Sequence, residues 1–262
     1  MGFADLRDLR VQYRDDGPRD GPALVLAHGL GMDMRVWDAV MPMLPEGLRV
    51  IRYDARGHGA TDCPAPPYKM GTLVRDAEGL LDHLKVRDCV FLGLAMGGMA
   101  AQGLAVKRMD LVRGLILSNT TSKSGPPEAW HDRAEAVLSG GMEAVAEAVL
   151  ARWFSRAFLD SDASEPSRAM LLSQNPQGYA GGCAAITGTD FYTPTSGLRL
   201  PCLGIAGSED RAIPPDLVRE TVGLIPGSQF QLLRRAGHLP CVDQPEAFAQ
   251  AVSRFLQEIG DL

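Results

Sequence analysis

Two segments near the C-terminus carry side chains that together could move a proton. Asp210 ends residues 205–210 (IAGSED), and His238 stands in residues 235–240 (RAGHLP). An imidazole is the usual general base near neutral pH, and a carboxylate bonded to its second nitrogen holds the ring in the productive tautomer. Glu209, next to Asp210, is the alternative carboxylate. The pair predicts a base that activates a hydroxyl group or a water molecule.

The hydroxyl group that such a base would activate is absent from the position where the pattern places it. Residues 91–98 (FLGLAMGG) lie between an apolar run and a helical pattern. G-x-S-x-G in this setting is a nucleophile elbow, a tight turn that exposes a serine. Gly93 and Gly97 fill both glycine positions, but the middle residue is Ala95. A methyl group cannot attack a carbonyl carbon, so the chain as written is expected to form no acyl-enzyme.

The surrounding loops predict the rest of an acyl-transfer site. Positions 95, 210 and 238 follow the order nucleophile, acid, base. The oxyanion hole is expected to consist of the backbone amides of Leu30, in the loop 27–31 (AHGLG), and Met96. Such donors each stabilise a transition state by ~3–4 kcal/mol. His28 is expected to support its loop. The turn 54–59 (DARGHG) is expected to be scaffolding, with Arg56 and His58 binding loop carbonyls.

Alternating apolar runs and helical patterns are predicted to position these groups on an α/β fold with a mostly parallel sheet. An alternating segment, 9–14, predicts a leading antiparallel strand. The buried strands are predicted at 23–27, 49–53, 89–94, 111–117, 202–206 and 229–233. Helices are predicted at 72–84, 97–108 and 245–257.

One region breaks this rhythm. Residues 119–195 contain helical patterns at 128–138, 141–157 and 164–173, and no strand pattern of comparable quality. We interpret this region as a helical cap, inserted into a core made of residues 1–118 and 196–262.

The composition excludes several classes of protein. A net charge of −6 argues against a nucleic-acid partner, which leaves a basic footprint. The five cysteines are widely spaced without a C-x-x-C pair, which argues against a disulfide framework or a zinc site. No run approaches the ~18 apolar residues of a membrane span, and the charged N-terminus is no signal peptide. A cytoplasmic protein without metal or membrane contact is expected. No interface signal predicts an oligomeric state.

The motifs together resemble the α/β-hydrolase superfamily over essentially the whole chain. This resemblance rests on HGLG, DARGHG, GLAMGG, AGSED and AGH, and it implies an eight-stranded sheet with helices on both faces. Within the cap, the segments SNTT, GPPEAW, ARWF and GYAGGCAAI resemble 3-oxoadipate enol-lactonases. Those enzymes open an enol-lactone ring with a Ser-His-Asp triad and no cofactor, which implies a small-molecule lactone or ester as substrate. HGLG is instead the general esterase form, since such lactonases often carry an Asn-Ser-Leu-Gly type loop.

A substrate of this kind carries a free carboxylate, so a cation should line the pocket. The predicted substrate-binding residues are Trp130, Arg133 and Trp153. Further candidates are the cations Lys123 and Arg35, the neutral donor His131 and the apolar Phe154.

Four explanations of Ala95 remain open at this stage. An engineered Ser-to-Ala change fits the intact motifs around it, whereas a natural pseudoenzyme would be expected to lose other motifs too. A third explanation is chemistry that needs only a His/Asp base, as in cofactor-free oxygenases and lyases of this fold. A fourth is a non-catalytic ligand-binding protein built on the same scaffold.

Overall fold

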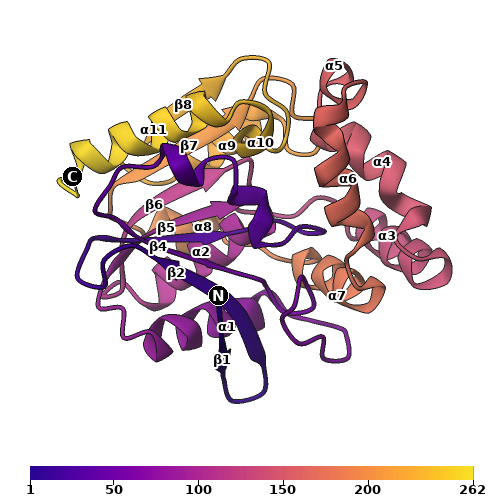
Figure 1. Ribbon diagram of the computed structural model, residues 1–262, viewed down its shortest axis with the longest axis horizontal. Coiled ribbons are helices and arrows are strands. Elements are labelled where there is room, and N and C mark those ends of the chain that lie inside the picture. The colour runs from indigo at the N-terminus through magenta and orange to yellow at the C-terminus, as the bar shows by residue number, and fades with distance from the viewer. Residues whose placement is uncertain (262) are drawn as a thin grey trace.

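An eight-stranded sheet runs through the computed structural model, which describes residues 1–261 (Figure 1). The strand order is β1-β2-β4-β3-β5-β6-β7-β8. Only the pairs β1–β2 and β2–β4 are antiparallel, so the predicted mostly parallel sheet is confirmed. The strands are β1 (Gly2–Asp5), β2 (Arg10–Asp16), β3 (Ala23–Ala27), β4 (Arg49–Tyr53), β5 (Cys89–Leu94), β6 (Val112–Ser118), β7 (Cys202–Gly207) and β8 (Gln229–Leu233).

The two faces of the sheet bury separate cores, because successive side chains of a strand point to opposite faces. In β3, Leu24 and Leu26 join one core together with Phe248. Val25 and Ala27 join the other core, beneath the helices that follow β4 and β5. Every residue of β3, β4, β5 and β7 is buried, which explains the continuous apolar runs of β3, β5 and β7. In β4, Arg49 and Arg52 are buried as ion pairs with Asp15 and Asp38.

Helices cover both faces and also extend beyond one end of the sheet. The core helices are α1 (Met70–His83), α2 (Met96–Lys107), α9 (Pro215–Gly223), α10 (Pro240–Asp243) and α11 (Pro245–Glu258), with short 3-10 helices η1 (Met34–Trp37) and η2 (Met41–Met43). None of the helices within residues 1–261 is long and apolar enough to cross a bilayer.

The segment between β6 and β7 contains a separate group of helices. They are α3 (Pro127–Gly140), α4 (Glu143–Trp153), α5 (Arg156–Leu159), η3 (Asp162–Ser164), α6 (Glu165–Leu172), α7 (Pro176–Ile186) and α8 (Tyr192–Ser196). In Figure 1, α3 to α7 gather at one end of the sheet. The last helix, α8, packs instead on α2, where the Thr195 hydroxyl donates to Gln102 Oε1 at 3.0 Å. The division of the chain at 119 and 195 therefore stays a prediction, with α8 lying on the core side in space.

Candidate active site

The turn between β5 and α2 has the geometry of an elbow although it carries no nucleophile. Ala95 has φ 51° and ψ −114°, a conformation that costs a residue with a Cβ of order 1–3 kcal/mol. Its N–H donates to Ser118 O at 3.0 Å, and its carbonyl accepts the Thr120 hydroxyl at 2.6 Å. The flanking glycines are steric requirements, because a Cβ on Gly97 would lie 2.3 Å from Ala27 O. The strained turn is thus held by its neighbours.

The carboxylate and the imidazole predicted from the sequence meet in the structure. His238 Nδ1 lies 2.8 Å from Asp210 Oδ2, and both side chains are buried. Asp210 Oδ1 accepts the backbone N–H groups of Ala212 at 2.7 Å and Ile213 at 2.9 Å. The alternative carboxylate, Glu209, is exposed to solvent. The geometry therefore selects Asp210 over Glu209 as the partner of the histidine.

A buried asparagine that the sequence interpretation did not assign to the site also contacts this pair. Asn119 Nδ2 donates to Asp210 Oδ2 at 2.8 Å and to Gly237 O at 3.2 Å. Asn119 directly follows β6, at the carboxyl end of a parallel strand, which is the edge where open α/β sheets place their ligands. This position was the signal that could have identified it.

Two backbone amides are free where the oxyanion hole is expected. The Leu30 N–H makes no hydrogen bond to another protein group within the described chain. Met96 is the first residue of α2, where an N–H has no intrahelical acceptor. His28 supports the first loop, since its Nδ1 lies 2.7 Å from Gly29 O and its Nε2 accepts the Ala55 N–H at 2.9 Å. The arrangement leaves two donors beside position 95.

The DARGHG turn is scaffolding, but one of its predicted contacts is wrong. His58 does meet a loop carbonyl, with its Nδ1 3.1 Å from Arg56 O, and it accepts the Gly31 N–H at 3.2 Å. Burial lowers the pKa of His58 to about 3, which keeps the ring neutral. Within residues 1–261 Arg56 binds no loop carbonyl, and it instead pairs with Asp76 at 2.8 Å. A guanidinium buried this deeply is paired with a carboxylate because a neutral carbonyl compensates its charge less.

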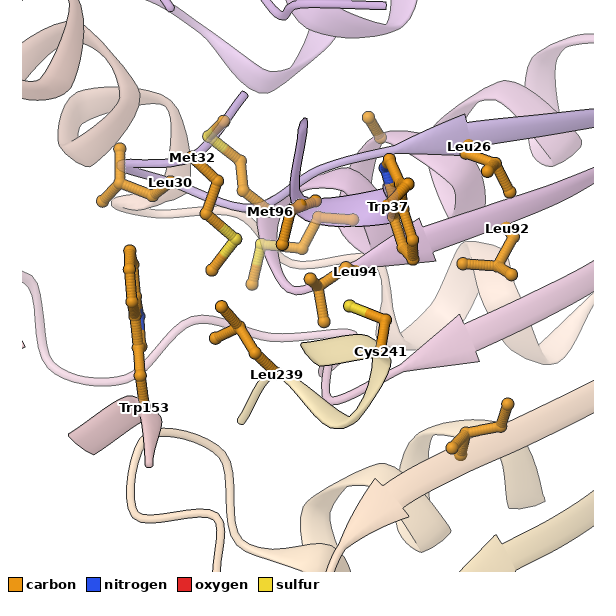
Figure 2. Packing of buried hydrophobic residues seen from close by; sticks show 14 of the residues in the cluster. Leu26, Leu30, Met32, Trp37, Leu92, Leu94, Met96, Trp153, Leu239 and Cys241 are labelled. Atoms are coloured by element: carbon orange, nitrogen blue, oxygen red, sulfur yellow. The ribbon is translucent and has the colours of Figure 1, made fainter. Parts of the chain in front are cut away.

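A pocket between the sheet and the cap opens onto position 95. Its core lining includes Leu30, Ala95, Met96, Thr120, Thr121, Ala212, Ile213 and His238, and its cap lining includes Trp130, Arg133, Val149, Arg152, Trp153, Tyr179 and Ile186. All three predicted substrate-binding residues, Trp130, Arg133 and Trp153, are therefore placed at this pocket. Figure 2 shows Trp153 and Leu239 in the same apolar cluster as Leu30, on its loop, and Met96, at the start of α2.

The other predicted substrate contacts lie elsewhere. Arg35 pairs with Asp33 at 2.7 Å. Lys123 pairs with Asp190 at 2.9 Å and lines an adjoining cavity, which shares Arg133 and Arg152 with the pocket. His131 lies on the exposed surface of α3, and Phe154 stacks on Phe158. Each cation is satisfied by a neighbouring acid, and Phe154 belongs to the packing of the cap.

The pocket holds a pair of arginines, one of which the sequence interpretation missed. Arg133 lies over the Trp130 ring at 4.8 Å, and Arg152 comes from the last turn of α4. Within residues 1–261 neither guanidinium forms an ion pair with a carboxylate. Partial loss of hydration lowers the pKa of Arg152, and the positive charge of Arg133 lowers it further. Two like charges facing one pocket favour an anionic ligand there.

The cap contacts His238 through its main chain. The His238 N–H donates to Trp153 O at 2.6 Å. Gly237 lets this carbonyl approach, because a Cβ at that position would lie 2.2 Å from it. The end of α4 thus holds the loop that carries the base.

A second carboxyl group, that of Asp243, contacts the same loop and has a raised pKa. Asp243 Oδ2 accepts the Gly237 N–H at 2.6 Å, while Oδ1 is buried without a hydrogen-bond partner in the described chain. Burial raises the pKa of Asp243 from 3.8 to about 7. Between pH 3.8 and about pH 7, the carboxyl is therefore protonated in the native state and ionised in the unfolded state. Its contribution to the free energy of unfolding is fully present below about pH 4 and is lost as the pH rises to about 7.

We expect Asp243→Asn to remove this pH dependence. The free energy of unfolding of the variant minus that of the parent should be about 2 kcal/mol larger at pH 8 than at pH 5, because only the parent must ionise a buried carboxyl. Urea unfolding at both pH values measures the difference. Glu246→Gln, at an exposed carboxylate close by, is the control and should show no such change. An equal stability difference at the two pH values would contradict the prediction.

Comparison with known proteins places this chain among the α/β hydrolases. The model of the alpha/beta hydrolase family matches residues 24–251. The chain is 32% identical to 3-oxoadipate enol-lactonase 2 of Acinetobacter baylyi, over 97% of this chain and 96% of that protein. It superposes on a hydrolase from Pseudomonas aeruginosa with a TM-score of 0.94 and 37% identity, over 97% of both chains. The enol-lactonase of Burkholderia xenovorans gives a TM-score of 0.93 and 34% identity, over 98% of this chain and 100% of that one.

Proposed function

Because the chain belongs to the α/β-hydrolase family, we propose that its site is built to hydrolyse a carboxylic ester or lactone, of the 3-oxoadipate enol-lactone type. The observation that carries this proposal is the Asp210–His238 pair, 2.8 Å apart, at a pocket that also contains the elbow and two free amides. Ala95 occupies the position of the nucleophile. The chain with Ala95 therefore lacks only the hydroxyl oxygen that a serine would supply to the proposed site.

With a serine at position 95, the reaction follows from the geometry. The hydroxyl attacks the carbonyl carbon, and His238 Nε2 takes its proton while Asp210 stabilises the imidazolium. The oxyanion accepts hydrogen bonds from the Leu30 and Met96 amides. His238 then returns the proton to the leaving oxygen, which in a lactone stays attached to the acyl group. A water molecule activated by the same histidine releases the acid and restores the serine.

The paired arginines support a substrate that carries a carboxylate. Neither Arg133 nor Arg152 is neutralised by a protein acid, and both line the pocket. A guanidinium binds a carboxylate through two parallel hydrogen bonds, a geometry that a neutral ester cannot satisfy. The pocket therefore favours a charged enol-lactone over a neutral ester.

We expect Arg133→Met, made together with Ala95→Ser, to raise KM for a carboxylate-bearing enol-lactone by about 10- to 100-fold, since a charge-assisted hydrogen bond is lost. KM for a neutral aryl ester should stay within about twofold. Steady-state kinetics with both substrates measures the difference. Arg156→Met removes the same charge from an exposed cap residue that does not line the pocket and is the matched control. An equal rise in KM for both substrates would contradict a carboxylate site.

A second candidate function follows from the alanine itself. His238 Nε2 makes no hydrogen bond within residues 1–261, so the chain as it stands carries a free base beside an oxyanion hole. Such a base could remove a proton from carbon next to a carbonyl group. Exchange of that hydrogen for deuterium in a ketone ligand, abolished by His238→Ala, would support this function. Absence of exchange, together with hydrolysis after Ala95→Ser, would favour the hydrolase.

A further inference from the structure

We propose that Asn119 is a positioning residue for the Asp210–His238 pair, an inference that rests on the proposed acid–base role of that pair. Its amide holds the carboxylate oxygen that faces the imidazole and, at the same time, the main chain beside the histidine. Asp210 Oδ2 accepts from both Asn119 Nδ2 and His238 Nδ1, each at 2.8 Å. The second amide hydrogen points to Gly237 O at 3.2 Å.

The orientation of this amide is determined by the two acceptors that it faces. Asp210 Oδ2 and Gly237 O can only accept, so the amide nitrogen, which carries both hydrogens, must lie on their side. This leaves Asn119 Oδ1 to accept a hydrogen bond from the Ser118 hydroxyl, at 2.9 Å. All the hydrogen-bonding groups of the side chain are therefore used, and the side chain is fully buried.

The backbone at this position also favours asparagine. Asn119 has φ 47°, in the left-handed region that asparagine and glycine adopt more readily than other residues. Its N–H donates to Ile205 O at 2.9 Å, which ties it to the strand that leads to Asp210. The adjacent residues hold the elbow, because Ser118 O and the Thr120 hydroxyl both bind the main chain of Ala95. One short segment thus joins all three catalytic positions.

A neutral donor is required at this point. An aspartate would place a second carboxylate at hydrogen-bond distance from Asp210, and the two would compete for a proton. An aliphatic side chain would leave Gly237 O without its donor and would release Asp210 Oδ2 from one of its two partners. The carboxylate could then rotate away from the Nδ1–H, and the imidazole would lose its fixed tautomer.

Two substitutions separate positioning from structural support. Asn119→Gly and Asn119→Ala remove the same amide, but glycine fits φ 47° whereas alanine is strained there. In the Ala95→Ser form, we expect both variants to lower kcat by the same factor, about 10- to 100-fold, with KM within about twofold. Their unfolding midpoints in urea should differ. Ser118→Ala, which keeps Asn119 but removes the donor to its Oδ1, should lower kcat in the same direction by a smaller factor.

A second measurement needs no substrate and uses the chain as it stands. The nitrogen-15 signals of the neutral His238 ring should show a protonated Nδ1 and an unprotonated Nε2 in the parent. In both Asn119 variants these two signals should move toward each other, because the second tautomer becomes populated. This readout decides the inference even if the Ala95→Ser form hydrolyses nothing, a result that would count only against the proposed function.

The control is Thr195→Val, which removes another fully buried hydrogen-bond donor, at a residue that does not line the pocket. It should leave both kcat and the His238 signals unchanged. The proposal is overturned if the nitrogen-15 signals stay at their parent positions in the folded variants. It is also overturned if kcat follows the unfolding midpoints, so that the alanine variant loses activity and the glycine variant does not.

Discussion

Replacing Ala95 with serine is expected to raise kcat for hydrolysis of an enol-lactone or an aryl ester by about 10⁴- to 10⁶-fold, the range over which removal of a nucleophilic serine acts. The turn needs no rebuilding, because Ala95 already has the strained φ of 51°. Serine adds a single oxygen to the existing Cβ. The proposed base and its carboxylate already lie 2.8 Å apart at the same pocket.

Turnover of both substrates, before and after the substitution, measures this effect. Mass spectrometry of a reaction stopped early should show an acyl group on the serine form only. Ala95→Gly is the matched control, since glycine accepts the positive φ but supplies no hydroxyl. If the serine form is no faster than the parent with either substrate, the hydrolase proposal is wrong. Tight ligand binding with no activity would then favour a binding protein.

The second large effect is expected from Asp210→Asn in the Ala95→Ser form, with kcat falling by about 10⁴-fold. The backbone N–H groups of Ala212 and Ile213 require an oxygen at the Oδ1 position. The new NH₂ group would therefore occupy the Oδ2 position and face the donors of His238 and Asn119. His238 could escape this clash only by making Nδ1 an acceptor, which puts the proton on Nε2 and removes the base.

Single-turnover kinetics of the Asp210→Asn form, which isolate the chemical step, measure this loss. Glu209→Gln neutralises the adjacent exposed carboxylate and should leave kcat unchanged. Retention of more than a tenth of the activity by the Asp210→Asn form would show that another group orients His238.

Sequence patterns predicted the parts of the site that depend on local backbone chemistry. The glycines around Ala95 and the order of Asp210 and His238 could be recognised in the sequence. A tight turn between a strand and a helix permits few residue types, so its pattern is distinctive. Asn119 and Arg152 were missed for a different reason. Their roles arise only when strands and helices distant in the sequence come together, and no local spacing records that contact.

The helices show the same division. The amphipathic pattern of α1 was predicted close to its observed bounds, whereas α7 was not predicted as a helix. Its glycines lower helix propensity, but packing requires them, since a Cβ on Gly178 would lie 1.8 Å from Gly57 O. Strand β1, only four residues long, has too little alternation to be recognised.

The main-chain bond from His238 to Trp153 O has a consequence for exchanging parts between relatives. A transplanted cap would have to do more than enclose a different substrate. It would also have to place a backbone carbonyl next to Gly237, at the end of its second helix. Without that carbonyl, the His238 N–H would lose its acceptor and the position of the imidazole would change. Trp153 and His238 should therefore come from the same parent protein, and the junctions of a chimera should be chosen so that this pair stays together.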